Sequence, residues 1–430
     1  MSRRRLLSAV SAATCGLLAL GGAGAATGSD YTHSTVVNDT SEGWVPHVAT
    51  TEGQPKPIAL TIAEAGDQMV VGGRFRTVEN GTRATQYSRD NVFAFDADTG
   101  AMNTGFAPQV DGDVRSAISD GTSVWIGGAF RNVNGQPRST LAKLDLATGQ
   151  LDPDFNPPFK GARVSDMELQ DNHLVIAGTI PKRLMSVNPD TGRPTSYIDH
   201  AVEGRLPNSD SAQVFKFDIS SDGQHLAAVG NFTGVDGAAR PRMFVLDLSA
   251  TGSTLSSWNY EPNGISCTSG RVNAQAYLQD VDFAPDSSWF AVAAFGYMYQ
   301  NGQRGFQLCD SVARFETGNL NPTQPTWINY TGGDSLKSVG VTDRAVYVQG
   351  HSRWLDNPFG QDSKGPGAVD RLGGGAVDPV TGKALPWNPV MPQQSGGYQI
   401  LPTAAGVWFV TDGTRFGGRY HRGVRFAALP

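Results

Sequence analysis

The chain has 430 residues, of which 52 are glycine and only 17% are charged, so it is rich in turn-forming residues and poor in those that cover helix surfaces. This composition excludes a coiled coil, a helical solenoid and an intrinsically disordered chain. With 34 Lys and Arg against 40 Asp and Glu, the net charge is −6. No basic surface for nucleic acid is expected, and we exclude nucleic acid as a partner.

The first 25 residues have the three parts of a secretory signal peptide. Three arginines at 3–5 are followed by a short apolar run at 6–20 and by a small-residue cleavage site, Ala23-Gly24-Ala25. The arginines fit the twin-arginine route and the general Sec route equally well. No stretch reaches the ~20 apolar residues that a membrane span needs. We therefore expect a secreted, extracellular protein without a membrane span, whose mature part is 26–430.

The mature part is built of repeats. An apolar segment that ends in glycine and is followed by Phe or another large apolar residue recurs at 70–75, 125–130, 175–180 and 227–232. The terminal glycines, Gly73, Gly128, Gly178 and Gly230, are 55, 50 and 52 residues apart. Three further apolar segments, at 292–295, 346–350 and 407–410, lack the full motif. Seven copies of one apolar strand indicate seven repeated sheets.

A second landmark follows six of these copies. It is a strand that runs into a Thr-Gly turn and then an aromatic residue, with turns at Thr99-Gly100, Thr148-Gly149, Thr191-Gly192, Thr251-Gly252, Thr317-Gly318 and Thr381-Gly382. Glycine supplies the positive φ of such a turn. The segment 40–46 near the N-terminus resembles the exit from the missing turn. We therefore predict an all-β fold, a seven-bladed β-propeller with an N-terminal strand closing the last blade.

The glycine-ended strands continue into a longer motif in the first two repeats. Gly73-Arg74-Phe75, Val78, Asn80-Gly81 and Arg83 match Gly128-Ala129-Phe130, Val133, Asn134-Gly135 and Arg138, and looser copies span 230–240 and 295–304. This motif resembles the delta-60-type repeat of secreted bacterial β-propellers. The resemblance is clear in blades one and two, adequate in four and five, and degraded in three, six and seven. It implies a β-propeller and no particular activity, because the family is defined by its repeat.

An insertion in the sixth repeat stands outside this pattern. Residues 351–370 replace the Asn-Gly loop and contain Trp354, which occupies no repeated position. A planar aromatic among polar side chains suits a sugar or a peptide edge, although Trp354 could instead cover a small core of the insertion itself. The candidate ligand-binding residues are His351, Arg353, Trp354 and Asp356, with Tyr297 and Tyr299 from the fifth blade's loop.

Cleavage of the signal would leave two cysteines, Cys267 and Cys309. An even pair in an exported protein predicts one disulfide, which here would act as a local staple. Both cysteines fall on the rim that carries the fifth blade's loop. We expect the bridge to hold that loop and its two tyrosines.

No catalytic, metal or cofactor motif is found. Gly333-Asp334-Ser335-Leu336 spells a lipase-type tetrapeptide but lacks that family's context. Acids recur at blade period near the inner strands, and their recurrence favours a structural role; they are Asp113, Asp166, Asp218, Asp282 and Asp343. We therefore expect a binding module, not an enzyme, without cofactor or metal, that recognises an extracellular glycan or protein ligand at its loop-rich face. A polysaccharide-active propeller enzyme (glycosidase or lyase) and a scaffold subunit are the alternatives, and the protein would be a monomer or a subunit of a hetero-assembly.

Overall fold

The computed structural model describes residues 31–207, 209–261, 267–268, 273–274, 277–296, 306–392 and 396–430. In these residues every regular element is a β-strand, no α-helix occurs, and the named strands pair antiparallel. Tyr297 and Tyr299 lie outside the described residues, as does the segment 1–30.

Seven main sheets of three or four strands follow one another along the described chain, and the other sheets there belong to short hairpins described below. The first three sheets consist of β2 (Ile58–Ala65), β3 (Gln68–Arg74) and β6 (Val92–Asp96); β7 (Asp113–Ser119), β8 (Ser123–Ala129) and β11 (Leu141–Asp145); and β12 (Val164–Gln170), β13 (His173–Gly178), β14 (Leu184–Val187) and β15 (Pro194–Asp199). The fourth and fifth consist of β17 (Val214–Ile219), β18 (His225–Gly230), β21 (Met243–Ser249) and β22 (Gly252–Leu255); and β25 (Tyr277–Phe283), β26 (Trp289–Phe295), β27 (Ser311–Glu316) and β28 (Trp327–Tyr330). The sixth and seventh consist of β29 (Leu336–Val341), β30 (Val346–Gly350) and β33 (Gly374–Val377); and β34 (Gly397–Thr403), β35 (Gly406–Thr411) and β38 (Val424–Ala428).

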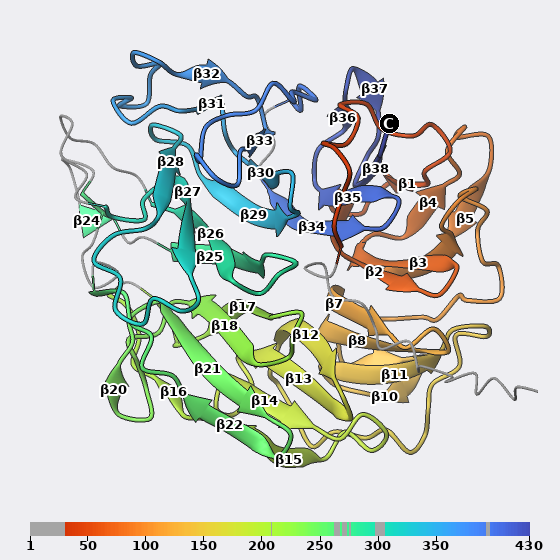
Figure 1. Cartoon of the computed structure of the whole chain (residues 1–430). Helices are drawn as coiled ribbons and strands as arrows, with labels where there is room; N and C mark the ends of the chain where they lie inside the picture. Colours follow the sequence, from red (N-terminus) through yellow and green to blue (C-terminus); the bar gives the residue numbers. More distant parts are fainter. Residues whose placement is uncertain are drawn as a thin grey trace, which may run out of the picture.

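The first strands of these sheets, which we call the inner strands, surround a common centre (Figure 1). Each contacts the inner strand of the next sheet, and β34 of the seventh sheet contacts β2 of the first. The hydrophobic core lies between successive sheets, as where Val70 of β3 and Ile126 of β8 belong to one buried cluster. Each sheet therefore buries apolar side chains on both faces, which explains why the second strands are almost wholly apolar.

All seven inner strands carry a β-bulge at the same place. In each, pairing with the second strand skips one residue near the start of the inner strand, and the skipped residues are Leu60, Arg115, Ser165, Phe215, Gln279, Lys337 and Tyr398. A bulge bends the strand and redirects a side chain. The repeated bulge therefore gives each sheet one residue, here called the bulge residue, that the ladder does not constrain.

The repeated glycine faces this bulge. A Cβ added to Gly128 would lie 2.0 Å from the carbonyl oxygen of Asp113 on the inner strand, and one added to Gly178 would lie 2.0 Å from that of Arg163. Gly230 repeats the geometry at 2.1 Å. In these sheets the bulged backbone approaches the glycine so closely that a side chain there would clash with it.

Replacing Gly128 by alanine is expected to lower the free energy of unfolding by about 1–3 kcal/mol, because the strand must move away from the bulge. Urea denaturation measures the change. Gly318→Ala is the matched control: its added Cβ would meet no atom within 4 Å, so its effect should stay within about 0.5 kcal/mol. Equal effects of the two substitutions would contradict the role given to the bulge.

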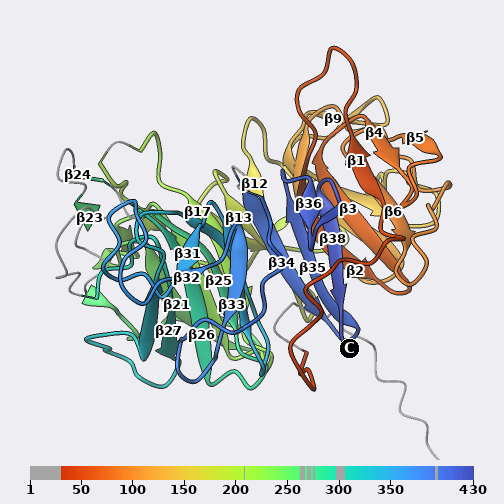
Figure 2. The same cartoon turned by 90° about the horizontal axis from the view of Figure 1, so that it is seen from above.

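Short hairpins follow most of the second strands. The described hairpin sheets are β1 (His47–Ala49) with β4 (Thr77–Glu79) and β5 (Gln86–Ser88); β9 (Asn132–Val133) with β10 (Gln136–Pro137); β16 (Val202–Glu203) with β19 (Gly234–Val235) and β20 (Ala238–Ala239); β23 (Cys267–Thr268) with β24 (Asn273–Ala274); β31 (Trp354–Leu355) with β32 (Val369–Asp370); and β36 (Arg415–Phe416) with β37 (Arg419–Tyr420). Strands from the preceding connections, β1 and β16, pair with two of these hairpins, and β23 and β24 pair in the connection between the fourth and fifth sheets. Figure 2 shows β4, β5 and β9 at the opposite end of the sheets from the C-terminus.

The Asn-Gly motif forms the turns of these hairpins. Asn134 and Gly135 have φ of 51° and 73°, as a type I′ turn requires at both central positions. In the seventh sheet, Gly417 and Gly418 have φ of 56° and 77° and make the same kind of turn between β36 and β37. This turn in the seventh repeat was not predicted from the sequence, because two glycines stand where the motif has Asn-Gly.

The repeated arginine fastens each hairpin to the outer part of its own sheet. Arg138 donates to the carbonyls of Pro137 (3.0 Å) and Pro153 (3.2 Å). In the first sheet the residue with this two-carbonyl pattern is Arg89, and the motif residue Arg83 does not have it. Arg83 lies instead over an aromatic ring of the seventh sheet's hairpin, because the first hairpin is longer than the second.

The start of the described chain runs beside β38. The amides of Asn38 and Glu42 donate to the carbonyls of Ala428 and Phe426, each at 2.9 Å. The structure assigns no strand to these residues, and β1 pairs with β4 of the first hairpin instead. The N-terminal segment therefore contacts the seventh sheet where a closing strand was expected, without forming a regular ladder with it.

Candidate ligand-binding channel

The seven bulge residues meet at one cavity. It has a volume of about 320 Å³ and lies where the inner strands begin, and we call it the channel mouth. The lining residues include all seven bulge residues, one from each sheet. Because the inner strands begin beside the ends of the second strands, the mouth and the hairpins share one face of the molecule. One residue from every sheet therefore reaches a single site on the loop-rich face.

The bulge residues differ in type from sheet to sheet, whereas the motif residues near them are repeated. They comprise two cations, two aromatics, an amide, a hydroxyl and an aliphatic side chain. The position following the bulge is polar in all seven sheets, occupied by Thr61, Ser116, Asp166, Lys216, Asp280, Ser338 and Gln399. The sequence carried a signal for this site: the bulge residue stands 13 positions before the motif glycine at Leu60, Arg115 and Ser165.

The mouth is cationic. Its described lining contains Arg115, Lys216 and Lys337 and no carboxylate. Lys216 forms an ion pair with Asp166 (2.8 Å), and Arg115 with Asp113 (3.0 Å). Lys337 has no carboxylate within ion-pair distance among the described residues, and burial lowers the pKa of its ammonium group. Its ammonium lies over a Phe ring of β26, 4.5 Å from the centroid.

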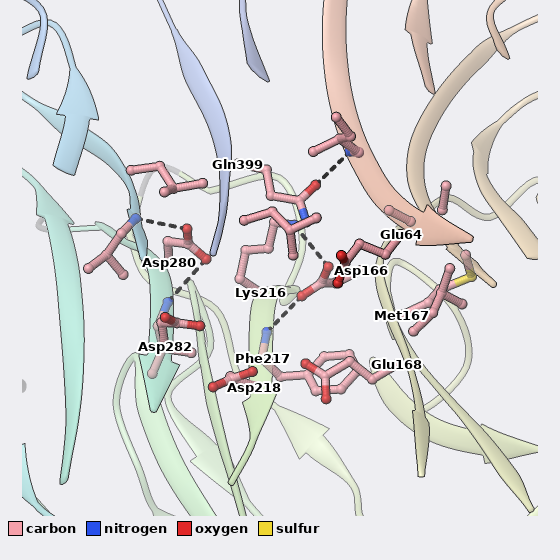
Figure 3. Close-up of a pocket in the computed structure, with 18 of the residues that line it drawn as sticks. Glu64, Asp166, Met167, Glu168, Lys216, Phe217, Asp218, Asp280, Asp282 and Gln399 are labelled. Atoms are coloured by element: carbon pink, nitrogen blue, oxygen red, sulfur yellow. Dashed lines mark hydrogen bonds and ion pairs between the residues drawn. The ribbon is translucent and has the colours of Figure 1, made fainter. Parts of the chain in front are cut away.

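Below the mouth, a second cavity of about 90 Å³ is acidic. Its acids come mainly from β12, β17 and β25 of three consecutive sheets, are each 4–8% exposed, and comprise Asp166, Glu168, Asp218, Asp280 and Asp282; Glu64 of β2 also lines it (Figure 3). We call the five the acid layer. Three of them were predicted from the sequence, and Glu168 and Asp280 were not.

The acid layer fastens one sheet to the next. Each carboxylate accepts a backbone N–H from the inner strand of the following sheet: Asp166 from Phe217 (3.0 Å), Glu168 from Ile219 (3.2 Å), Asp218 from Phe283 (2.6 Å), Asp280 from Val339 (3.0 Å) and Asp282 from Val341. The seventh and first sheets are joined in a similar way, because the Gln399 amide oxygen accepts from the backbone N–H of Ile62 (2.9 Å). The structural role predicted for Asp166, Asp218 and Asp282 is confirmed.

Burial changes the charge of this layer. It raises the pKa of Asp280 to about 7, and burial together with the neighbouring Asp218 raises the pKa of Glu168 well above its usual value. Lys216 lies between Asp166 and Asp280 (Figure 3), and attraction to both carboxylates outweighs burial and raises the pKa of its ammonium group. The Asp280 carboxyl is therefore partly protonated near neutral pH. In the described residues no group of three or more His, Cys, Asp or Glu side chains could hold a metal ion.

The residues predicted in the sixth repeat's insertion lie together on β31 and its flanks, away from the centre of the molecule (Figure 1). The guanidinium of Arg353 is 4.3 Å from the Trp354 ring centroid and pairs with Asp334 (2.8 Å). Asp356 accepts from the side-chain amide of Asn329 (2.7 Å). His351 is exposed on the same segment. Arg353, Trp354 and Asp356 thus contact their own neighbours, and ligand binding at the insertion stays a prediction.

The predicted disulfide is present. Cys267 and Cys309 are bonded, and both are fully buried. Cys309 lies just before β27 of the fifth sheet, and Cys267 begins the hairpin strand β23. The bridge therefore joins two parts of the chain that are 42 residues apart.

No family model matches the chain, and no curated protein matches it. Among solved structures, the chain is similar to the WD40 repeats of RRP9, at 8% identity, covering 92% of this chain and 100% of that chain with a TM-score of 0.51. Looser matches are the WD40 β-propeller domain of Doa1 (9% identity, 89% and 96% covered, TM-score 0.44) and Kuenenia stuttgartiensis hydrazine synthase (12% identity, 84% and 96% covered, TM-score 0.46). No helix in the described part is long and apolar enough to span a membrane. The fold is all-β and of the β-propeller type.

Proposed function

We propose that this protein is a secreted, seven-bladed β-propeller of the delta-60 repeat type that binds an extracellular glycan or protein ligand at its loop-rich face. The contacts of β34 with β2 support closure of the ring, and the hydrogen bonds of residues 38–42 to β38 support completion of the last blade by the N-terminal segment. The signal-like start of the chain and the Cys267–Cys309 disulfide support secretion.

The channel mouth carries this proposal. Seven residues of different chemistry, each freed from the ladder by a bulge, line one cavity on the face that bears the hairpins. Side chains of different chemistry that meet at one cavity can contact different groups of one ligand. Loops and irregular positions on a rigid scaffold are where proteins place binding residues. The insertion with His351, Arg353, Trp354 and Asp356 is a second contact on the rim.

A polysaccharide-active enzyme is the second candidate. Asp280, with a pKa of about 7, keeps a proton that a general acid could donate. Against this role, an oxygen of Asp280 and one of each other carboxylate in the acid layer already accept a backbone N–H. These carboxylates therefore join neighbouring sheets, and this structural role favours a binding function for the protein over catalysis.

A glycan array and a pull-down from culture supernatant, run beside a reducing-sugar assay on cell-wall and plant polysaccharides, test these functions. We expect binding without product release. Phe215→Ala and Tyr398→Ala should each weaken binding by about tenfold or more, because each removes an aromatic face from the mouth. Thermal melting controls for folding.

Trp354→Ala is the comparison variant for the rim. Loss of binding in Trp354→Ala alone, with the mouth variants unaffected, would move the site to the insertion. Product release would replace the binding function by catalysis. Recovery of one stoichiometric protein partner without any glycan would identify a scaffold subunit.

A further inference from the structure

We propose that the channel mouth takes a carboxylate-bearing saccharide, a residue of the uronic acid type. This inference rests on the proposed binding function and names the chemistry of its ligand. It follows from the charge, the free donors, the aromatic faces and the size of the mouth.

The charge of the mouth is opposite to that of the chain. The chain has a net charge of −6, yet the described lining of the mouth holds three cations and no acid. Asp113 lies between two guanidiniums, accepting from Arg74 (2.9 Å) and from Arg115 (3.0 Å), so one positive charge is left over. Lys337 adds a second charge; Asp310 attracts it, but no described carboxylate lies within ion-pair distance of its ammonium. An anion entering the mouth would meet these charges in partly desolvated surroundings, where attraction is strong.

The mouth also has unused hydrogen-bond donors. The Nε of Arg115 is buried and has no hydrogen-bond partner among the described residues. The ammonium of Lys337 contacts a ring face and makes no hydrogen bond with the residues described here. A ligand carboxylate in the mouth would give the Lys337 ammonium a hydrogen-bond acceptor that the described residues do not supply. Arginine is suited to this because its guanidinium can hold a carboxylate through two parallel bonds.

The remaining lining suits a sugar ring. Phe215 and Tyr398 supply aromatic faces, and Gln279 and Ser165 supply groups that both donate and accept hydrogen bonds. Aromatic faces pack against the C–H groups of a ring while polar side chains bond its hydroxyls. The volume of about 320 Å³ is near the lower end of ligand pockets and admits a small saccharide, not a folded domain.

Isothermal titration of the purified protein with tri-galacturonate and with galactotriose tests the inference. The two probes share ring size and length and differ in the carboxylates. We expect tri-galacturonate to bind about tenfold or more tightly than galactotriose, and its affinity to fall as sodium chloride rises from about 50 to 500 mM. A sulfated galactose oligomer is a third probe, and preference for sulfate over carboxylate would overturn the choice of a uronate.

Two substitutions locate the site. Lys337→Gln and Arg115→Gln should each weaken tri-galacturonate binding by about tenfold, because each removes a charge-assisted hydrogen bond. Arg193→Gln is the matched control: Arg193 is exposed and follows the Thr191-Gly192 turn, at the other ends of the strands, so affinity should not change. Thermal melting shows whether each variant is folded.

The outcomes separate this inference from the proposed function. Equal affinity for the acidic and neutral probes, or no binding of tri-galacturonate, would overturn the proposal that the ligand is a uronate. A neutral glycan or protein whose binding is lost in Phe215→Ala leaves the binding function standing. Tri-galacturonate binding that survives Phe215→Ala, Lys337→Gln and Arg115→Gln puts the ligand outside the mouth; it overturns the inference about the mouth and leaves glycan binding in place.

Discussion

Asp166→Ala is expected to lower the free energy of unfolding by about 3–5 kcal/mol, because it leaves a buried ammonium without its partner. The Asp166 carboxylate pairs with Lys216 at 2.8 Å, and the Lys216 side chain is only 16% exposed. The same carboxylate accepts the amide of Phe217 at 3.0 Å, so the substitution also opens a link between the third and fourth sheets. Urea denaturation at pH 7 measures the loss.

Two further variants show how the loss arises. Asp166→Ala combined with Lys216→Met should recover most of the stability, because no unpaired charge is then buried. Asp166→Asn should fall between the wild type and Asp166→Ala, because its amide oxygen can still accept from Phe217. If the double variant is no more stable than Asp166→Ala alone, the ion pair does not determine the stability of the channel.

Removing the disulfide should be nearly as costly. The bridge joins residues 42 apart, and closing a loop of that length in the unfolded chain corresponds to about 4 kcal/mol in the chain-entropy model. We expect Cys267→Ala with Cys309→Ala to lose about 2–4 kcal/mol in urea denaturation.

Reduced wild-type protein is the control, and its denaturation midpoint should match that of the double variant. An unchanged midpoint in both would contradict the stabilising role. Two free thiols in the unfolded, unreduced protein would show that the bridge does not form.

The sheets could be predicted from the sequence because their key residue is fixed by geometry. Gly73, Gly128, Gly178 and Gly230 each face an inner-strand bulge that leaves no room for a Cβ, so they recur at nearly constant spacing. Where the motif changes, as at Ala294 opposite the fifth bulge, the apolar second strand still marked the sheet. In the first sheet Arg89 makes the two-carbonyl contact in place of the motif residue Arg83, because the first hairpin is longer than the second.

The site could not be predicted in the same way. A bulge is a property of strand register, and no residue type encodes it, so the residues that it redirects carry no motif of their own. Repeated residues mark the motif, whereas the bulge residues differ from sheet to sheet. Arg115, Phe215 and Lys337 therefore have no counterpart of the same type in the other repeats. Trp354 attracted attention instead because it stood outside the repeat. Asp218 and Asp282 were correctly given a structural role, since they occupy equivalent positions and accept equivalent backbone amides, those of Phe283 and Val341, from the following inner strand.

A crystal structure of the protein grown or soaked with tri-galacturonate tests the central claim, that the ligand binds where the seven bulge residues meet. The account predicts density for the saccharide in the channel mouth, with a carboxylate within hydrogen-bond distance of Arg115 or Lys337 and a ring against Phe215 or Tyr398. A saccharide bound only at the insertion around Trp354, or an open mouth that holds none at saturating concentration, would contradict it.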